Sequence, residues 1–251
     1  MNRPLTAFAA LLAAAATAAS GTLQQQLPSA ESILDRYIEV SGGKAAYANL
    51  KNLSLTGKIE MPDAGLSGTL TAVSAEPDFS RTTVEFPGAG RFETGTGAGR
   101  AWQLNPVQGA RLLTGAELKR TLRLYRFNAA FNWRGVYSKV VTEAEEDVAG
   151  KPCYRLRLTA KDGEAPDTAW YDKQSGLVVK TRLTLPTEQG DVTMESEPGD
   201  YRDVGGIKFP FSISQKVGPQ SVKVTFGEAR INSELPASVF DLPEAIQKLV
   251  K

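Results

Sequence analysis

The hydrophobic and polar positions of this chain follow two different periods. Near the N-terminus, apolar residues recur at helical spacing directly after Ser29, a residue type that caps helix N-termini. This pattern predicts a helix over residues 30–41 that ends at Gly42, where left-handed backbone forms easily. A second short helical turn is expected over residues 44–49.

From Leu53 onward the period changes to two. Leu53, Leu55 and Ile59 share one face of a predicted strand, with polar residues between them. Similar stretches, bounded by Gly, Pro or Asp, continue to residue 231, and they do not alternate with helices as in a parallel sheet. The pattern therefore predicts a mainly β (α+β) fold with one long antiparallel sheet of about ten or eleven strands, interrupted by a few short helices. A twisted sheet of that size must curl or close, which gives it a concave face.

The middle of the chain interrupts the strands. Thr114 and Glu117 have the spacing of a capping box, which predicts a helix. Another helical turn is expected over residues 128–133. Farther along, Pro210 lies inside a predicted strand, which indicates a sheet edge or a bulge because proline has no backbone N–H.

The first residues resemble a secretory signal. Residues 1–20 carry Arg3 as their only charge, followed by an Ala- and Leu-rich run and small residues near its end. We expect cleavage there, leaving residues 21–251 as one soluble, exported domain. No Cys lies near the expected cleavage site, so the mature chain should not be lipidated.

Charge and composition exclude several partners. Without Arg3, 28 of the 29 basic residues remain against 28 acidic ones, and no basic block is present. This balance argues against nucleic acid and anionic membrane surfaces as partners. We expect a monomer that does not span a membrane.

The residue types needed for common catalytic chemistry are missing. The chain has no His and one Cys, Cys153, which excludes Ser-His-Asp and Cys-His catalysis and most zinc sites. Cys153 is interpreted as a structural thiol, and the acidic run at residues 143–147 as a solvated loop. We predict no catalytic residue, metal site or cofactor. An enzyme that uses carboxylates alone stays open as a minor alternative.

Several short motifs resemble one known family. They are Gly68-Thr-Leu, Pro77-Asp-Phe79, Gly99-Arg-Ala-Trp102, Asn105-Pro106 and the ending Ala237-Ser-Val-Phe-Asp-Leu-Pro243. Together with the N-terminal helix, they are similar to the LolA/LolB-like superfamily of periplasmic lipoprotein carriers. One departure is Arg81, which stands where LolA-type proteins often carry an aromatic residue.

The resemblance implies that the sheet is a curved, half-open antiparallel β-barrel around a hydrophobic cavity, with a few short helices as its lid or plug. Known members carry acylated lipoproteins from the inner to the outer membrane, which implies a periplasmic location and a role in outer-membrane biogenesis. No lid-locking residue of the family can be matched to a position in this sequence.

Aromatic and apolar residues around the central helix are the candidates for a ligand-binding surface. They are Trp102, Leu118, Leu122, Tyr125, Phe127, Phe131, Trp133 and Trp170. Ordinary core packing is the commoner role of such residues.

Two functions compete on this fold. The first is a non-catalytic carrier or binding protein that shelters an acyl chain or the lipid part of a lipoprotein. The second is a module with a filled interior that binds another envelope protein through a sheet edge or the lid face. An apolar void of several hundred cubic ångströms favours the carrier, and a solid interior favours the module.

Overall fold

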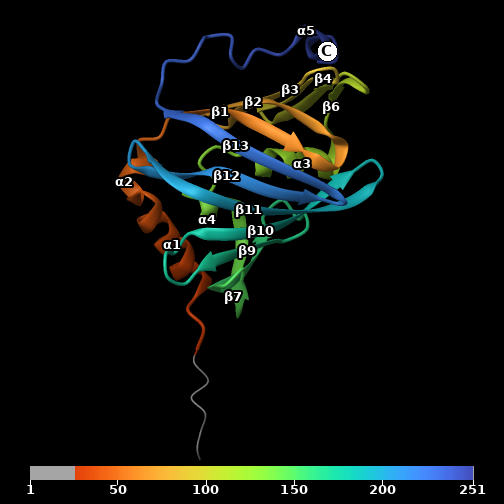
Figure 1. Cartoon of the computed structure of the whole chain (residues 1–251). Coiled ribbons are helices and arrows are strands. Elements are labelled where there is room, and N and C mark those ends of the chain that lie inside the picture. Colours follow the sequence, from red (N-terminus) through yellow and green to blue (C-terminus); the bar gives the residue numbers. More distant parts are fainter. Residues whose placement is uncertain (1–25, 251) are drawn as a thin grey trace, which may run out of the picture.

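The computed structural model describes residues 26–250 and consists mainly of one continuous antiparallel sheet (Figure 1). The leader predicted over residues 1–20 lies outside the described residues. Over residues 26–250 the strands are β1 (Asn52–Met61), β2 (Leu66–Ala75), β3 (Phe79–Phe86), β4 (Gly90–Gly97), β5 (Arg100–Asn105), β6 (Gly109–Leu112), β7 (Tyr137–Val148), β8 (Lys151–Ala160), β9 (Asp167–Asp172), β10 (Val178–Thr187), β11 (Gly190–Val204), β12 (Ile207–Val217) and β13 (Gln220–Ile231).

The sheet is built from two meanders that meet at its centre. Its strand order is β6-β5-β4-β3-β2-β1-β13-β12-β11-β10-β9-β8-β7. The first strand of the sheet, β1, therefore pairs with the last, β13, and both pairings of β1 are antiparallel. We call strands β1–β6 one wing of the sheet and strands β7–β13 the other. Figure 1 shows the sheet curving strongly from one wing to the other.

The predicted mainly β, antiparallel class is confirmed, but the expected strand number is wrong. Residues 26–250 hold a sheet of thirteen strands, and it is not closed into a barrel, because β6 and β7 end it at opposite edges. The very short β6 has only four residues, too few for a period of two to become visible in the sequence.

The helices within residues 26–250 are short. They are α1 (Ala30–Ser41), α2 (Gly43–Ala48), the 3-10 turn η1 (Pro62–Ala64), α3 (Gly115–Leu124), α4 (Trp133–Val136) and α5 (Glu244–Gln247). The prediction for α1 is confirmed at both ends. Ser29 Oγ accepts a hydrogen bond from the Ser32 N–H at 3.2 Å, and Gly42 follows the last turn with φ 156°. No helix in this part of the chain has the length and apolar composition to cross a membrane.

The helix after Thr114 is present, but its capping box is not formed. The Thr114 side chain makes no capping hydrogen bond, and Glu117 binds Arg111 of β6 instead. Within the expected span of residues 128–133 one helical hydrogen bond forms, from the Asn132 N–H to the Asn128 carbonyl oxygen at 3.1 Å, and the regular helix α4 begins at Trp133.

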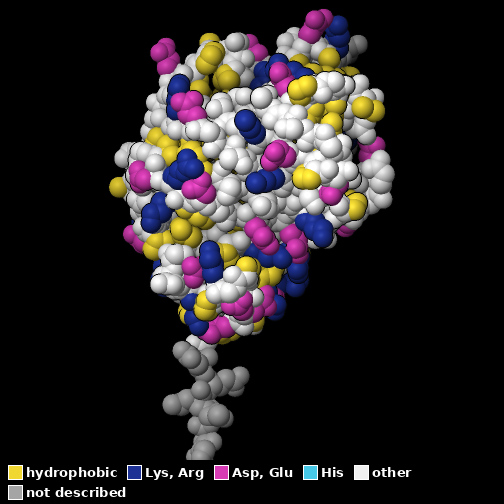
Figure 2. Space-filling model, in the orientation of Figure 1, with side chains coloured by type: hydrophobic (Ala, Val, Ile, Leu, Met, Phe, Trp, Pro, Cys, Tyr) yellow, Lys and Arg dark blue, Asp and Glu magenta, His cyan; other side chains and the backbone are white. Residues whose placement is uncertain are grey.

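The two faces of the sheet are different. We call the face that carries Leu55 and Ala72 the inner face and the opposite one the outer face. A cluster of apolar inner-face residues joins the two wings across β1 and β13: Leu70, Phe211, Val224 and Phe226 are its buried members. On the side of the molecule seen in Figure 2, acidic and basic side chains are intermixed, as expected from the balanced charge.

Helices α1 and α2 pack against strands of the β7–β13 wing. Residues Ile33 and Leu34 of α1 pack with Leu156 and Tyr171 of β8 and β9. Around α2, a second cluster contains Ile38, Tyr47, Leu50, Phe127 and Ile207. The inner face of β1–β3 is covered instead by the connection between α3 and α4.

The C-terminal segment lies on the outer face of β3–β5, above the sheet in Figure 1. The Arg81 guanidinium donates to the carbonyl oxygens of Val239 and Asp241 at 3.4 and 3.3 Å. The rings of Phe79 and Phe240 are 5.5 Å apart between their centroids. Arg81 therefore anchors the segment in which the sequence places a Phe before a Pro.

Pro210 lies in a half-paired strand. Over its whole length β12 pairs with β11, but its pairing with β13 covers only Ser212 to Val217. The first half of β12, with Pro210, thus has a local edge, which is one of the two settings that the sequence indicated.

Candidate functional site

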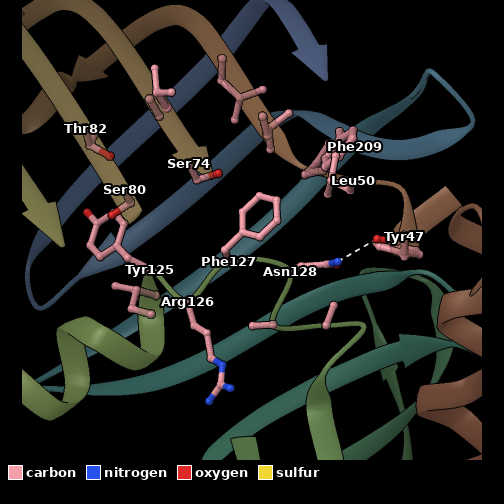
Figure 3. Close-up of a pocket in the computed structure, with 18 of the residues that line it drawn as sticks. Tyr47, Leu50, Ser74, Ser80, Thr82, Tyr125, Arg126, Phe127, Asn128 and Phe209 are labelled. Atoms are coloured by element: carbon pink, nitrogen blue, oxygen red, sulfur yellow. Dashed lines mark hydrogen bonds between the residues drawn. The ribbon is translucent and has the colours of Figure 1, made fainter. Parts of the chain in front are cut away.

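A cavity of about 300 Å³ lies between the inner face of β1–β3 and the connection from α3 to α4 (Figure 3). Its lining comes from Tyr37 of α1, residues 47 and 50 at and after the end of α2, strands β1–β3, residues 124–130 and residues 208–210 of β12. Small-molecule sites in proteins have volumes of about 300–1,000 Å³, so this space is sufficient for a small ligand. We call it the apolar cavity.

The sheet wall of the apolar cavity consists of two rows of residues across three strands. In one row, Leu55 of β1 pairs with Ala72 of β2, which pairs with Thr82 of β3. The next row has the same arrangement: Leu53, Ser74 and Ser80. The wall is therefore apolar toward β1 and carries hydroxyl groups toward β3. Figure 3 shows Ser80 and Thr82 side by side on β3, close to Tyr125.

The connection from α3 to α4 forms the roof of the apolar cavity. Tyr125 and Phe127 supply its aromatic rings. The Phe127 N–H donates to Asp78 Oδ1 at 3.2 Å, and Asn128 Nδ2 donates to the Tyr47 carbonyl oxygen at 2.9 Å, the dashed line in Figure 3. These contacts attach the roof to the turn before β3 on one side and to α2 on the other.

Two tyrosines and a phenylalanine form the side wall. Tyr37 and Tyr47 come from α1 and α2, and Phe209 comes from β12. The Tyr47 hydroxyl is 2.8 Å from Ser41 Oγ. Burial raises the pKa of Tyr37 well above its usual value, and burial also raises the pKa of Tyr47. Both phenols therefore stay neutral, and this wall presents rings rather than charge.

Buried charge pairs hold α3 over the sheet. Arg120 Nη1 is 2.6 Å from Asp167 Oδ1, and the two side chains are only 4% and 7% exposed. Arg123 contacts Asp162 at 2.5 Å and Asp167 at 3.5 Å. The roof is therefore attached to β9 and the β8–β9 loop by ion pairs, in addition to its apolar contacts.

A second cavity, of about 320 Å³, lies beside α3. Leu122 and Val136 supply apolar surface, and the other lining side chains include four cations and two carboxylates: Lys119, Arg123, Arg126, Lys161, Asp78 and Asp162. We call it the charged cavity. Among the described residues that line either cavity, only Arg126 lines both.

Four of the residues predicted to bind a ligand lie at or beside the cavities. Tyr125 and Phe127 line the apolar cavity, and Leu122 lines the charged cavity. Phe131 stacks on Tyr47, a lining residue, with ring centroids 5.8 Å apart and planes 5° from parallel. Ligand binding by these four stays a prediction.

The other four are not brought together. Trp133 is buried in the cluster beneath α1, and Leu118 lines neither cavity. Trp102 lies on the outer face, with the Arg81 guanidinium 5.7 Å from the centre of its ring. A Cβ at Gly95 would approach that ring to 2.3 Å, so only glycine fits beneath Trp102.

Trp170 also lies on the outer face. Its indole N–H donates to Glu146, and Lys180 Nζ is 5.6 Å from the centre of its ring. Its strand neighbours Ala169 and Tyr171 point the other way, into the core beneath α1. Trp170 is therefore buried beneath charged side chains of the outer face, and it lines neither cavity.

Several lining residues are not among the ligand candidates that the sequence indicates. The period of two places Leu53 and Leu55 on one face of a strand, but nothing in one strand shows which face is the inner one. In the sequence, Tyr47 is part of a short helical turn and Phe209 stands beside Pro210. The sequence signal for Phe209 is the apolar residue on each side of Pro210 in this half-paired strand.

Cys153 is buried and does not belong to either cavity. Its Sγ donates to the Lys151 carbonyl oxygen at 3.2 Å, and burial raises the pKa of its thiol. Across residues 26–250, no three His, Cys, Asp or Glu side chains are arranged to hold a metal ion.

Comparison with known proteins identifies the fold but not the function. No family model matches the chain, and no curated protein matches it. Among solved structures, a LolA superfamily protein from Nitrosomonas europaea superposes with a TM-score of 0.56 at 16% identity, covering 86% of this chain and 99% of that one. This chain has the LolA-like fold. The family resemblance of the sequence motifs is thereby confirmed at the level of the fold.

Two further solved structures share the LolA-like fold. A DUF1329 family protein from Desulfovibrio piger gives a TM-score of 0.58 at 13% identity, covering 84% of this chain and 97% of that one. A domain from Vibrio parahaemolyticus, named as an outer membrane lipoprotein-sorting protein, gives 0.54 at 14% identity with the same coverages.

Proposed function

We propose that this chain is a non-catalytic carrier or binding protein that shelters an acyl chain, or the lipid part of a lipoprotein, in its apolar cavity. The observation that carries the proposal is the cavity itself, about 300 Å³ between a largely apolar sheet wall and an aromatic roof. A filled interior would have favoured the envelope-protein module, and this cavity supports the carrier.

The energetics are compatible with a ligand that competes with the roof. Each methylene of an acyl chain that leaves water contributes about 0.8 kcal/mol. The roof is attached by two hydrogen bonds, from Phe127 and Asn128, and by the ion pairs of α3. Several methylenes can therefore offset the loss of the two hydrogen bonds, at about 1 kcal/mol each, without breaking the buried ion pairs.

The leader-like residues and the fold support a location outside the cytoplasm. A protein exported to the periplasm would meet acylated proteins and phospholipids there. The solved relative named for outer membrane lipoprotein sorting agrees with a role in outer-membrane biogenesis, and this assignment remains part of the proposal.

The proposal is tested by ligand binding to the purified chain. We expect lipid to copurify after periplasmic expression, detected by native mass spectrometry and solvent extraction. We also expect a fluorescent fatty acid to bind at micromolar concentration and to be displaced by laurate. If neither lipid nor probe is bound, the carrier function is excluded.

A matched pair of variants locates the binding. Ala72→Phe places a ring in the apolar cavity and should weaken probe binding by about tenfold or more. Its neighbour Thr71 is exposed on the outer face, so Thr71→Phe adds the same ring elsewhere and should leave binding unchanged. Equal loss in both variants would place the probe outside this cavity.

A further inference from the structure

Arg126 occupies the boundary between the two cavities. It follows Tyr125 in the roof, so its backbone and side-chain stem lie at the apolar cavity. Its guanidinium extends away from the sheet wall, as Figure 3 shows, and Nη2 lies 3.6 Å from where a Cβ would stand at Gly135, a residue of the charged cavity. A chain in the apolar cavity would therefore have this cation at one end.

The guanidinium of Arg126 has no partner among residues 26–250. No carboxylate oxygen of this part of the chain lies within 4.0 Å of it, and it donates no hydrogen bond there. The neighbouring arginines of α3 are different, since Arg120 and Arg123 are both held by Asp167. The five N–H donors of Arg126 are thus available for an external acceptor.

Most of the other cations that line the charged cavity have a partner within the chain. Arg123 is paired with Asp162 at 2.5 Å, and Lys119 with Glu164 at 3.2 Å. Lys161 Nζ donates to the Arg134 carbonyl oxygen at 2.8 Å and forms no ion pair among residues 26–250.

One carboxylate opposes these cations. Asp78 also lines the charged cavity, and one of its oxygens accepts the Phe127 N–H. When the paired groups are left out, the cations Arg126 and Lys161 remain with the carboxylate Asp78. The charged cavity therefore has a net positive charge.

We propose that Arg126 binds the anionic headgroup of an amphiphile whose acyl chain occupies the apolar cavity. The headgroup chemistry is a carboxylate or a phosphate, because a guanidinium binds two oxygens of either group with parallel hydrogen bonds. This inference rests on the proposed function, and it narrows the ligand from any acyl chain to an anionic one. The carboxylate of a fatty acid and the phosphate of a phospholipid share this chemistry.

The test compares four probes with the same twelve-carbon chain. Laurate and dodecyl phosphate carry the two anionic headgroups, dodecanol is neutral, and dodecyltrimethylammonium is cationic. Displacement of an uncharged fluorescent probe gives each affinity. We expect both anionic probes to bind about tenfold more tightly than dodecanol, the size of a charge-assisted hydrogen bond. Acetate and inorganic phosphate, which have no chain, should not bind.

Three variants assign the preference to one residue. Arg126→Gln should lower the affinity for laurate and dodecyl phosphate by about tenfold and leave that for dodecanol unchanged. Arg126→Lys should restore most of the preference. The control is Arg157→Gln, which removes the same charge from the outer face, where Arg157 is 56% exposed. Equal thermal midpoints of the variants would exclude unfolding as the cause.

The outcomes separate this inference from the proposed function. If laurate and dodecanol bind equally, or if Arg126→Gln weakens both equally, headgroup recognition by Arg126 is wrong and the carrier function remains. If only one anionic probe shows the preference, the headgroup is assigned to that chemistry. If no twelve-carbon probe binds to the unmodified protein, both the inference and the proposed function are excluded.

Discussion

Arg120 and Asp167 form a charge pair with almost no access to solvent. Their contact is 2.6 Å long, and Asp167 also accepts a hydrogen bond from the Tyr137 hydroxyl at 3.3 Å. Two guanidinium nitrogens of Arg120, Nε and Nη2, are buried without a partner among the described residues. A cation buried in this way depends strongly on its one carboxylate, because removing that carboxylate leaves an uncompensated charge.

Removing that carboxylate should destabilise the fold strongly. Asp167→Asn should lower the free energy of unfolding by about 3–5 kcal/mol, as measured by urea denaturation. The control is Asp35→Asn, which breaks the exposed pair of Asp35 with Arg134 and should cost less than about 1 kcal/mol. Similar losses in both variants would contradict the role assigned to burial.

Among the helices of residues 26–250, the two longest, α1 and α3, begin differently although both are preceded by a hydroxyl residue. Ser29 caps α1 through its side chain, whereas the Thr114 side chain does not cap α3. Glu117, the expected partner in the capping box, is taken by Arg111. The ion pair of Glu117 with Arg111 thus replaces the local capping box. Helix α3 is positioned by its ion pairs with other elements.

The two caps should therefore respond differently to alanine. Ser29→Ala should lower the free energy of unfolding by about 1 kcal/mol, because it removes a capping hydrogen bond. Thr114→Ala should change it by less than about 0.5 kcal/mol, the usual range for a surface substitution without special contacts. Urea denaturation followed by circular dichroism measures both. A larger loss for Thr114→Ala would show that its side chain does cap α3.

The sequence could predict elements better than the site. Helix α1 follows from its spacing and cap, and the face shared by Leu53 and Leu55 follows from the period of two. The period cannot tell which face of a strand is inner, and Trp102 and Trp170, which the sequence offers as aromatic candidates near the central helix, both lie on the outer face. The contact of Tyr47 with the roof depends on the tertiary fold, which local patterns do not contain.

Most of the tyrosines, from the helical segments and the β7–β13 wing of the sheet, are buried or half-buried. Burial raises the pKa of six of the seven tyrosines. They are Tyr37, Tyr47, Tyr125, Tyr137, Tyr171 and Tyr201. A raised pKa means that the folded protein holds the phenolic proton more tightly than the unfolded chain, where tyrosine titrates near pH 10.

Stability should accordingly fall at alkaline pH. The contribution of these phenols is fully present below about pH 10 and is lost as the pH rises above that value toward their folded pKa values. Absorbance at 295 nm should show most of the phenolate signal appearing together with unfolding, and the urea midpoint should decrease above about pH 10. Titration of all the tyrosines near pH 10 with the sheet intact would contradict the burial.

The central pairing of β1 with β13 concentrates the slow part of folding in one place. Every other neighbouring pair in the sheet joins consecutive strands, so each wing can assemble from contacts that are local along the chain. We call the β1–β13 pairing the seam. Pairing Leu53 with Ile231 closes a loop that contains nearly the whole domain, so the chain loses the entropy of that closure before contacts at the seam stabilise it. Gly57 lies on this seam, where a Cβ would come within 2.4 Å of the Thr225 carbonyl oxygen. The two wings can thus form early and independently, while the cavity between roof and sheet becomes complete only when the seam closes.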